Sequence, residues 1–157
     1  MPHPVDMVVD TGDKGDLWMD AIEAEKRGDR EDSLRICREL VIGEPDNSDA
    51  WMMIARMELP APTKGKQEMP SLVQTAKSVT ALKKVVQLDP ENRRAWDLGG
   101  TLLVDHLGMM EDALTWWEER REHAPAEVTP LIEQVSILVR MGYYEECADL
   151  IEEMFSP

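Results

Sequence analysis

The sequence is poor in the residues on which sheets and disulfide-linked folds depend. Only 5% of its 157 residues are aromatic, and β-branched residues seldom alternate with polar ones, so a β-sheet is not expected. The two cysteines, Cys37 and Cys147, lie far apart in apolar stretches, which is typical of small buried hydrophobes. What remains is rich in Ala, Leu, Glu, Met and Arg, which favour helices. The composition predicts an all-α fold.

Positive charge is also scarce. Lysine and arginine number 17 against 32 acidic residues, which gives a net charge of −15. Such a chain repels polyphosphates, because nucleic-acid binding depends on neutralising phosphates, and we expect no nucleic-acid partner. No apolar run approaches the roughly 20 residues that span a bilayer, and no apolar leader follows a charged N-terminus. We therefore expect no membrane association and a cytoplasmic location.

The sequence lacks the patterns that mark a reaction centre. None of His3, His106 and His123 has a second metal ligand at helical spacing. No glycine-rich phosphate loop, Gly-x-Ser-x-Gly turn or nucleophile with a recognisable base is present. The last predicted helix carries an acidic set typical of a solvated outer face: Glu145, Glu146, Asp149, Glu152 and Glu153. We expect no enzyme activity, no cofactor and no metal.

What is present is an internal repeat. Residues 44–51, EPDNSDAW, return as residues 89–96, DPENRRAW, and more weakly as residues 124–131, APAEVTPL. In all three copies a large apolar residue follows six positions after a proline. Repeats of this length bury their apolar faces by stacking on one another, and they present surfaces.

Punctuation between the copies predicts helical hairpins. Small residues recur at one position of four successive units, where two helices must approach closely: Ser33, Ser78, Ala113 and Cys147. Glycines at 28, 108 and 142 suit the turn between the two helices of a unit, although the second unit lacks one. The expected helices cover residues 15–27, 30–43, 48–59, 71–87, 93–107, 109–123, 129–141 and 143–155.

The pattern resembles the tetratricopeptide repeat. The residues that carry the likeness are Trp51, Trp96, Leu98, Gly99, Gly108, Ala113 and Pro125. The resemblance implies a right-handed helical-hairpin solenoid of about four repeats. We expect an extended segment at 1–14 and a single domain at 15–157, with repeats at about 15–47, 48–92, 93–127 and 128–157.

Two departures from the pattern stand out. The third unit has one extra residue between Trp96 and Gly108, and the second has eleven extra between Pro45 and Pro90. The second insertion, residues 60–70, contains prolines at a spacing that no helix allows, so we expect a protruding loop.

The resemblance also implies a binding face, because the first helix of each such repeat lines a concave groove. Projected onto this chain, the partner-binding residues are Trp18, Met19, Ile22, Met52, Met53, Arg56 and Leu59. A register error of one residue would instead place Met52 and Met53 in the core. The Lys, Asn and Arg clamp that some relatives use for a terminal carboxylate is replaced by Trp18, Ile22 and Met53, so we expect no such clamp.

We therefore expect a protein-interaction adaptor or scaffold. Its partner would be another protein with an extended or helical apolar segment, with or without basic residues. Two alternatives stay open: a holding chaperone for a hydrophobic client, and a subunit that forms a homodimer through the C-terminal helix, whose apolar residues include Leu150, Ile151, Met154 and Phe155. The N-terminal residues 4–9 could also occupy the chain's own groove.

Overall fold

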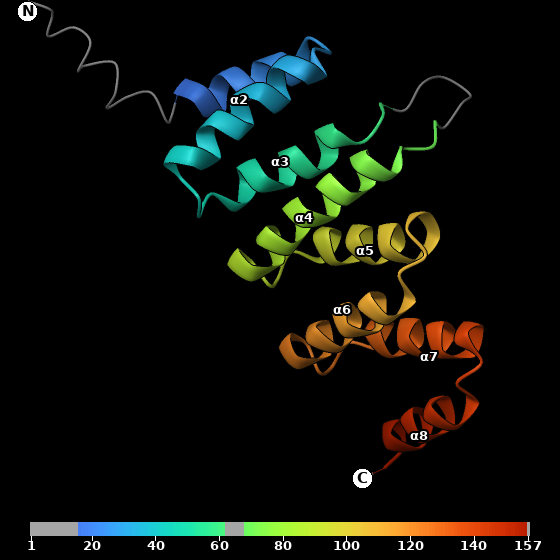
Figure 1. Ribbon diagram of the computed structural model, residues 1–157. Helices are drawn as coiled ribbons and strands as arrows, with labels where there is room; N and C mark the ends of the chain where they lie inside the picture. The colour runs from blue at the N-terminus through green and yellow to red at the C-terminus, as the bar shows by residue number, and fades with distance from the viewer. Residues whose placement is uncertain (1–15, 62–67, 157) are drawn as a thin grey trace, which may run out of the picture. The chain divides into compact units, whose positions relative to one another are not determined.

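The computed structural model describes residues 16–61 and 68–156, and every regular element in these ranges is helical (Figure 1). A first helix covers residues 16–26. The others are α2 (Arg30–Gly43), α3 (Ser48–Glu58), α4 (Leu72–Leu88), α5 (Arg93–Thr101), the π-helical turn η1 (Leu102–His106), α6 (Met110–His123), α7 (Thr129–Met141) and α8 (Tyr144–Met154). From residue 30 onward the predicted helix bounds differ from these by at most one residue. The all-α prediction is confirmed.

The chain divides into two compact units, Met1–Asp89 and Pro90–Pro157, here called the N-terminal and C-terminal units. In the N-terminal unit α3 packs against both α2 and α4, and in the C-terminal unit α6 packs against α5 and α7, and α7 against α8. The single domain at 15–157 stays a prediction. The expected extended segment at 1–14 and residues 62–67 of the expected loop lie outside the described residues, and the flanking residues 60–61 and 68–70 are non-helical.

The two full copies of the repeated phrase form the same local structure. In each copy the indole N–H donates to the carbonyl of the proline six residues earlier, at 2.8 Å from Trp51 Nε1 to Pro45 O and at 2.8 Å from Trp96 Nε1 to Pro90 O. The asparagine two residues after each proline accepts a backbone N–H three residues on, at 3.0 and 3.1 Å, and so caps the helix. The third copy has leucine in place of tryptophan, and α7 has no side-chain cap.

The small residues predicted between paired helices lie at the close approaches. In three repeats this residue contacts a backbone carbonyl on the preceding helix of the same repeat. The contacts are Ser33 Oγ to Ala21 O at 3.1 Å, Ser78 Oγ to Ala55 O at 2.8 Å and Cys147 Sγ to Val135 O at 4.0 Å. A longer side chain would push the helices apart, so the packing prediction is confirmed.

The extra residue of the third repeat forms the π-helical turn. The Leu107 N–H donates to Leu102 O at 3.0 Å, five residues earlier, and such a turn holds one residue more than an α-helical turn. The chain then turns at Gly108, whose φ of +64° suits a residue without a Cβ. Gly28 and Gly142 each have φ of +81° at the matching places, which confirms the predicted turns.

Two adjacent glycines let two adjacent tryptophans enter the core of the C-terminal unit. A Cβ built on Gly99 would lie 2.3 Å from the Trp116 ring, and one on Gly100 would lie 2.4 Å from the Trp117 ring. Both rings are buried, and Trp116 Nε1 donates to the carbonyl of Trp96 at 2.8 Å. The glycines are therefore packing residues here.

A buried arginine, Arg120, binds residues at the start of the C-terminal unit. Arg120 donates to Pro90 O at 2.7 Å, forms an ion pair with Glu127 and lies over the Trp96 ring, with its guanidinium carbon 5.8 Å from the centroid. The hydrogen bonds from Arg120 hold the pKa of Glu127 below its usual range, against the opposing effect of burial. The guanidinium thus joins the proline of the repeated phrase to the loop after α6.

Candidate functional site

The candidate site is a surface groove of about 470 Å³ in the N-terminal unit. Its lining residues come from α2, α3 and α4, and α3 packs against both of the other two helices (Figure 1). The lining residues are Arg38 and Val41 from α2, Trp51, Ile54 and Glu58 from α3, and Ala76, Lys77, Thr80 and Ala81 from α4. We call it the α2–α4 groove.

The groove has an apolar floor that is held in place before any ligand arrives. Trp51 and Ile54 lie three residues apart on α3, which places them on one side of the helix. Because the Trp51 indole N–H is bonded to the carbonyl of Pro45, the ring keeps its orientation while part of it stays exposed. Small side chains at Ala76 and Ala81 on the α4 wall leave the floor open.

Of the three charged residues that line the groove, Lys77 alone has no ion-pair partner among the described residues. Glu58 is the acid of the lining, and its buried carboxylate forms an ion pair with Arg38. Lys77 on the opposite wall is exposed. Helix α4 contains three lysines, Lys77, Lys83 and Lys84, and no acidic residue, although the whole chain carries −15. Carboxylates are therefore the groups that this wall attracts.

The residues predicted to line a concave face are placed differently from one another. Met19 is 56% exposed, and Trp18, Ile22, Met52 and Leu59 are half-buried. Their role in partner binding stays a prediction.

Met53 requires a correction, because it lies in the core with only 4% of its surface exposed. On α3 the buried residues include Ala50, Met53, Ile54 and Met57, the i, i+3, i+4, i+7 spacing of one helix face. The sulfur of Met53 accepts the Ser33 hydroxyl at 3.2 Å. Successive residues on a helix point about 100° apart, so the predicted face was rotated at this position, and the core alternative is right for Met53.

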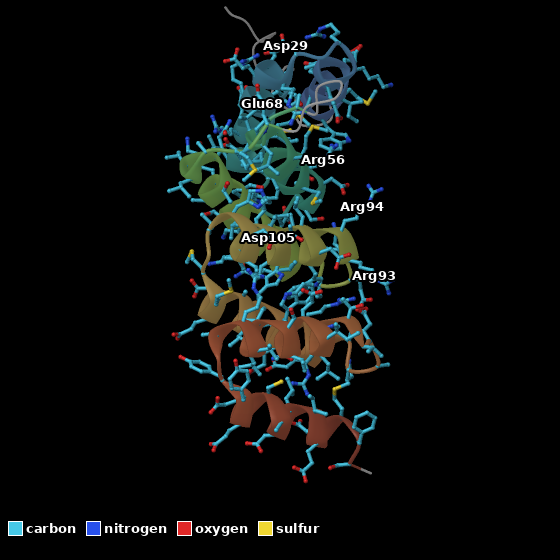
Figure 2. All side chains as sticks on the ribbon, turned by 90° about the vertical axis from the view of Figure 1, so that its right-hand side faces the viewer. Asp29, Arg56, Glu68, Arg93, Arg94 and Asp105 are labelled. Carbon is cyan, nitrogen blue, oxygen red and sulfur yellow. The ribbon has the colours of Figure 1, made fainter. Side chains whose placement is uncertain are left out.

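Arg56 joins elements of the N-terminal unit. Arg56, a residue of α3 that Figure 2 labels, donates from its guanidinium to Glu25 on the first helix at 3.0 Å. Arg30 on α2 donates to the carbonyls of Arg56 and Leu59, at 2.7 Å each. These bonds hold the last turn of α3 against its neighbours. Arg56 and Leu59 therefore have a structural role, whatever else they contact.

The described residues also bear on whether the chain holds a metal site, a reactive thiol or a membrane-spanning helix. Residues 16–61 and 68–156 contain no group of three or more His, Cys, Asp or Glu side chains placed to hold a metal ion. Burial raises the pKa of the Cys37 thiol to about 11, with the Arg56 charge opposing it, which leaves the thiol protonated and a poor nucleophile. None of the described helices is long and apolar enough to cross a membrane.

Sequence reasoning missed the residues of the α2–α4 groove. Trp51 drew attention only as a repeat marker, and Arg38 and Lys77 drew none. The available signal was the absence of acids from residues 72–88 in so acidic a chain. The groove also requires residues 38, 54 and 77 to line one surface. That depends on tertiary packing and leaves no periodic pattern in the sequence.

Comparison with solved structures places the fold. The chain is similar to a crystal structure of MamA, with a TM-score of 0.63 and 12% identity over 90% of this chain and 71% of the other. It is also similar to residues 41 to the end of MamA from Desulfovibrio magneticus RS-1, with a TM-score of 0.58 and 20% identity over 90% and 73% of the two chains.

A third similar structure is the first tetratricopeptide repeat domain of Spaghetti (RPAP3), bound to the HSP90 peptide SRMEEVD. Its TM-score is 0.54, with 16% identity over 82% of this chain and 95% of the other. No protein-family model and no curated protein matches the sequence. These likenesses show a tetratricopeptide-like helical-repeat fold, as the sequence predicted.

Proposed function

We propose that the protein is a non-catalytic interaction module, an adaptor that binds an amphipathic segment of another protein in the α2–α4 groove. The observation that carries the proposal is an apolar groove whose one unpaired lining charge, Lys77, is positive in a chain of net charge −15. A volume of about 470 Å³ suits a few side chains. A short helix or extended peptide supplies these without burying a whole domain.

The chemistry of the groove specifies the partner. Apolar side chains set over Trp51 and Ile54 gain about 25 cal/mol for each Å² of apolar surface removed from water. Carboxylates beside them meet Lys77, and such complementarity fixes register and speeds association more than it adds affinity. The partner segment is therefore apolar on one face and acidic at its flanks.

The fold is compatible with this role. A domain of the same fold holds a peptide in the RPAP3 structure. The carboxylate clamp expected of some relatives is not proposed for this chain, because its places are taken by Trp18, Ile22 and the buried Met53. The concave face around Met19 and Met52 remains the alternative location for the same function.

Capture experiments with matched variants test the location. The tagged protein is used as bait in an extract of its native host beside Lys77→Glu, Met19→Glu and the control Lys26→Glu, which reverses an exposed lysine on the first helix. We expect the wild-type bait, Met19→Glu and Lys26→Glu to capture a protein that Lys77→Glu does not. The purified wild-type bait should bind that protein directly, and purified Lys77→Glu should not. Loss with Met19→Glu alone would move the site to the concave face, and capture insensitive to Lys77→Glu would refute the groove.

A further inference from the structure

Helix α8 carries an apolar stripe that is exposed. Tyr144, Ala148 and Ile151, with the C-cap residue Phe155, recur at intervals of four, three and four residues, which places the three helical ones on one side of the helix and Phe155 at its end. Ile151 is 39% exposed and Phe155 is 80% exposed. Their neighbours Cys147, Leu150 and Met154 lie on the other apolar side and are buried or half-buried. The helix therefore has two apolar sides, and only one of them is covered by described residues.

Equivalent positions in the other repeats indicate what kind of contact this stripe can make. Ile151 follows the small residue Cys147 by four positions, as Cys37, Leu82 and Trp117 follow the small residues of their own repeats, and all three are buried. Phe155 follows by eight positions, as Val41 and Val86 do, and these too are buried. In the N-terminal unit α3 packs on α2, and in the C-terminal unit α7 packs on α6. By the same rule the stripe of α8 is a docking face for a helix.

Charge decides which helix of this chain can dock there. Helix α8 has five acidic residues and no basic one. A second α8 would bring Glu145 and Glu152 of both copies, four carboxylates, to one contact, which argues against the symmetric homodimer through this helix. The first helix, residues 16–26, has four acids and one lysine and is also repelled. Helix α4 has three lysines and no acid, and it borders the apolar α2–α4 groove.

We propose that α8 of one copy docks in the α2–α4 groove of a second copy. Ile151 and Phe155 lie over Trp51 and Ile54, and the acids beside the stripe, Glu145 and Glu152, meet the lysines of α4. The contact joins two different surfaces, so it is heterologous and each copy offers both halves. The proposal rests on the proposed function, since it names the groove's occupant as a segment that fits the stated chemistry.

Two complementary variants test the contact. The groove variant carries Lys77→Glu and Lys84→Glu, which reverse two exposed charges on the same face of α4. The tail variant carries Ile151→Ser and Phe155→Ser, which remove exposed apolar groups from α8. A control carries Ile42→Ser, at an exposed apolar residue of α2 outside the groove. Circular dichroism first establishes that all three keep the helical content and melting temperature of the wild type.

Sedimentation velocity then follows purified full-length protein from roughly 1 μM to roughly 1 mM, the range expected for a small interface. We expect the wild type and the control to associate, and each variant alone to associate at least about tenfold more weakly. An equimolar mixture of the two variants should form a heterodimer near wild-type affinity, because one supplies an intact groove and the other an intact tail. A symmetric α8 dimer instead predicts that the groove variant, whose α8 is intact, associates like the wild type, and that the mixture contains no heterodimer.

Each result has one meaning. Monomeric wild type throughout the range overturns the second copy as occupant. In that case Lys77-dependent capture of a different protein still supports the proposed function, whereas capture insensitive to Lys77→Glu refutes both proposals. Association that the tail variant abolishes and the groove variant keeps at wild-type strength overturns the heterologous contact and supports α8 pairing with itself.

Discussion

Replacing Met53 by glutamate should strongly destabilise the N-terminal unit. Met53 is 4% exposed, and its sulfur contacts the buried Ser33 hydroxyl. Truncating a buried methionine costs about 2–5 kcal/mol, and glutamate adds the desolvation of a carboxylate with no partner. We expect a loss of about 4 kcal/mol or more, against a typical total stability of about 5–15 kcal/mol. For a chain of this length that is a fall of about 10 °C in the melting temperature.

The assay is urea unfolding followed by far-UV circular dichroism, with three control variants at methionines. Met19→Glu, at a site that is 56% exposed, should change the free energy of unfolding by less than about 0.5 kcal/mol. Met52→Glu, at the half-buried neighbour, should cost much less than Met53→Glu. Met53→Leu conserves volume and should cost less than about 1.5 kcal/mol. A Met53→Glu protein as stable as the wild type, with Met52→Glu unfolded, would refute the assigned face of α3.

Three further changes test other parts of the structure. Gly99→Ala should destabilise by about 1–3 kcal/mol in a thermal melt, because its Cβ would overlap the Trp116 ring, despite alanine's preference for helices. Glu127 has a lowered pKa from its bonds to Arg120, so its stabilisation should be complete above the ordinary value of 4.5 and be lost as the pH falls through the lower, folded value; Glu127→Gln should flatten that part of the stability profile. In a Cys147→Ala protein, Cys37 should react with Ellman's reagent only on unfolding, since its thiol is 0% exposed with a pKa of about 11.

Helix positions were predictable because the signals that set them are local. A glycine that must adopt positive φ marks a turn wherever it stands, and Asn47 and Asn92, each two residues after a proline, cap the helices that follow. The recurring small residue also worked, since Ser33 and Ser78 contact the preceding helix of their own repeat. Even the extra residue of the third repeat was visible as a length difference, although its form as a π-helical turn was not.

The site was less predictable because it depends on orientation and on distant neighbours. Met52 and Met53 are adjacent in sequence, yet one is half-buried and the other is in the core, so an error of one residue reverses the interpretation. The burial of both Trp116 and Trp117 required the glycine pair on α5 to face them, which is a matter of register between two helices. The groove required residues from three helices at once.

The charge distribution also constrains how the proposed self-association depends on salt. Two copies of net charge −15 repel at long range, while the α8 acids and α4 lysines attract at contact. Salt screens exposed charges beyond about 30 Å at 0.01 M and beyond about 10 Å at 0.1 M, so moderate salt weakens the long-range repulsion before it weakens the contact. Association measured by sedimentation should therefore pass through a maximum as salt rises. A purely apolar contact would strengthen continuously with salt, and a steady fall from the lowest salt would show that attraction dominates at every distance.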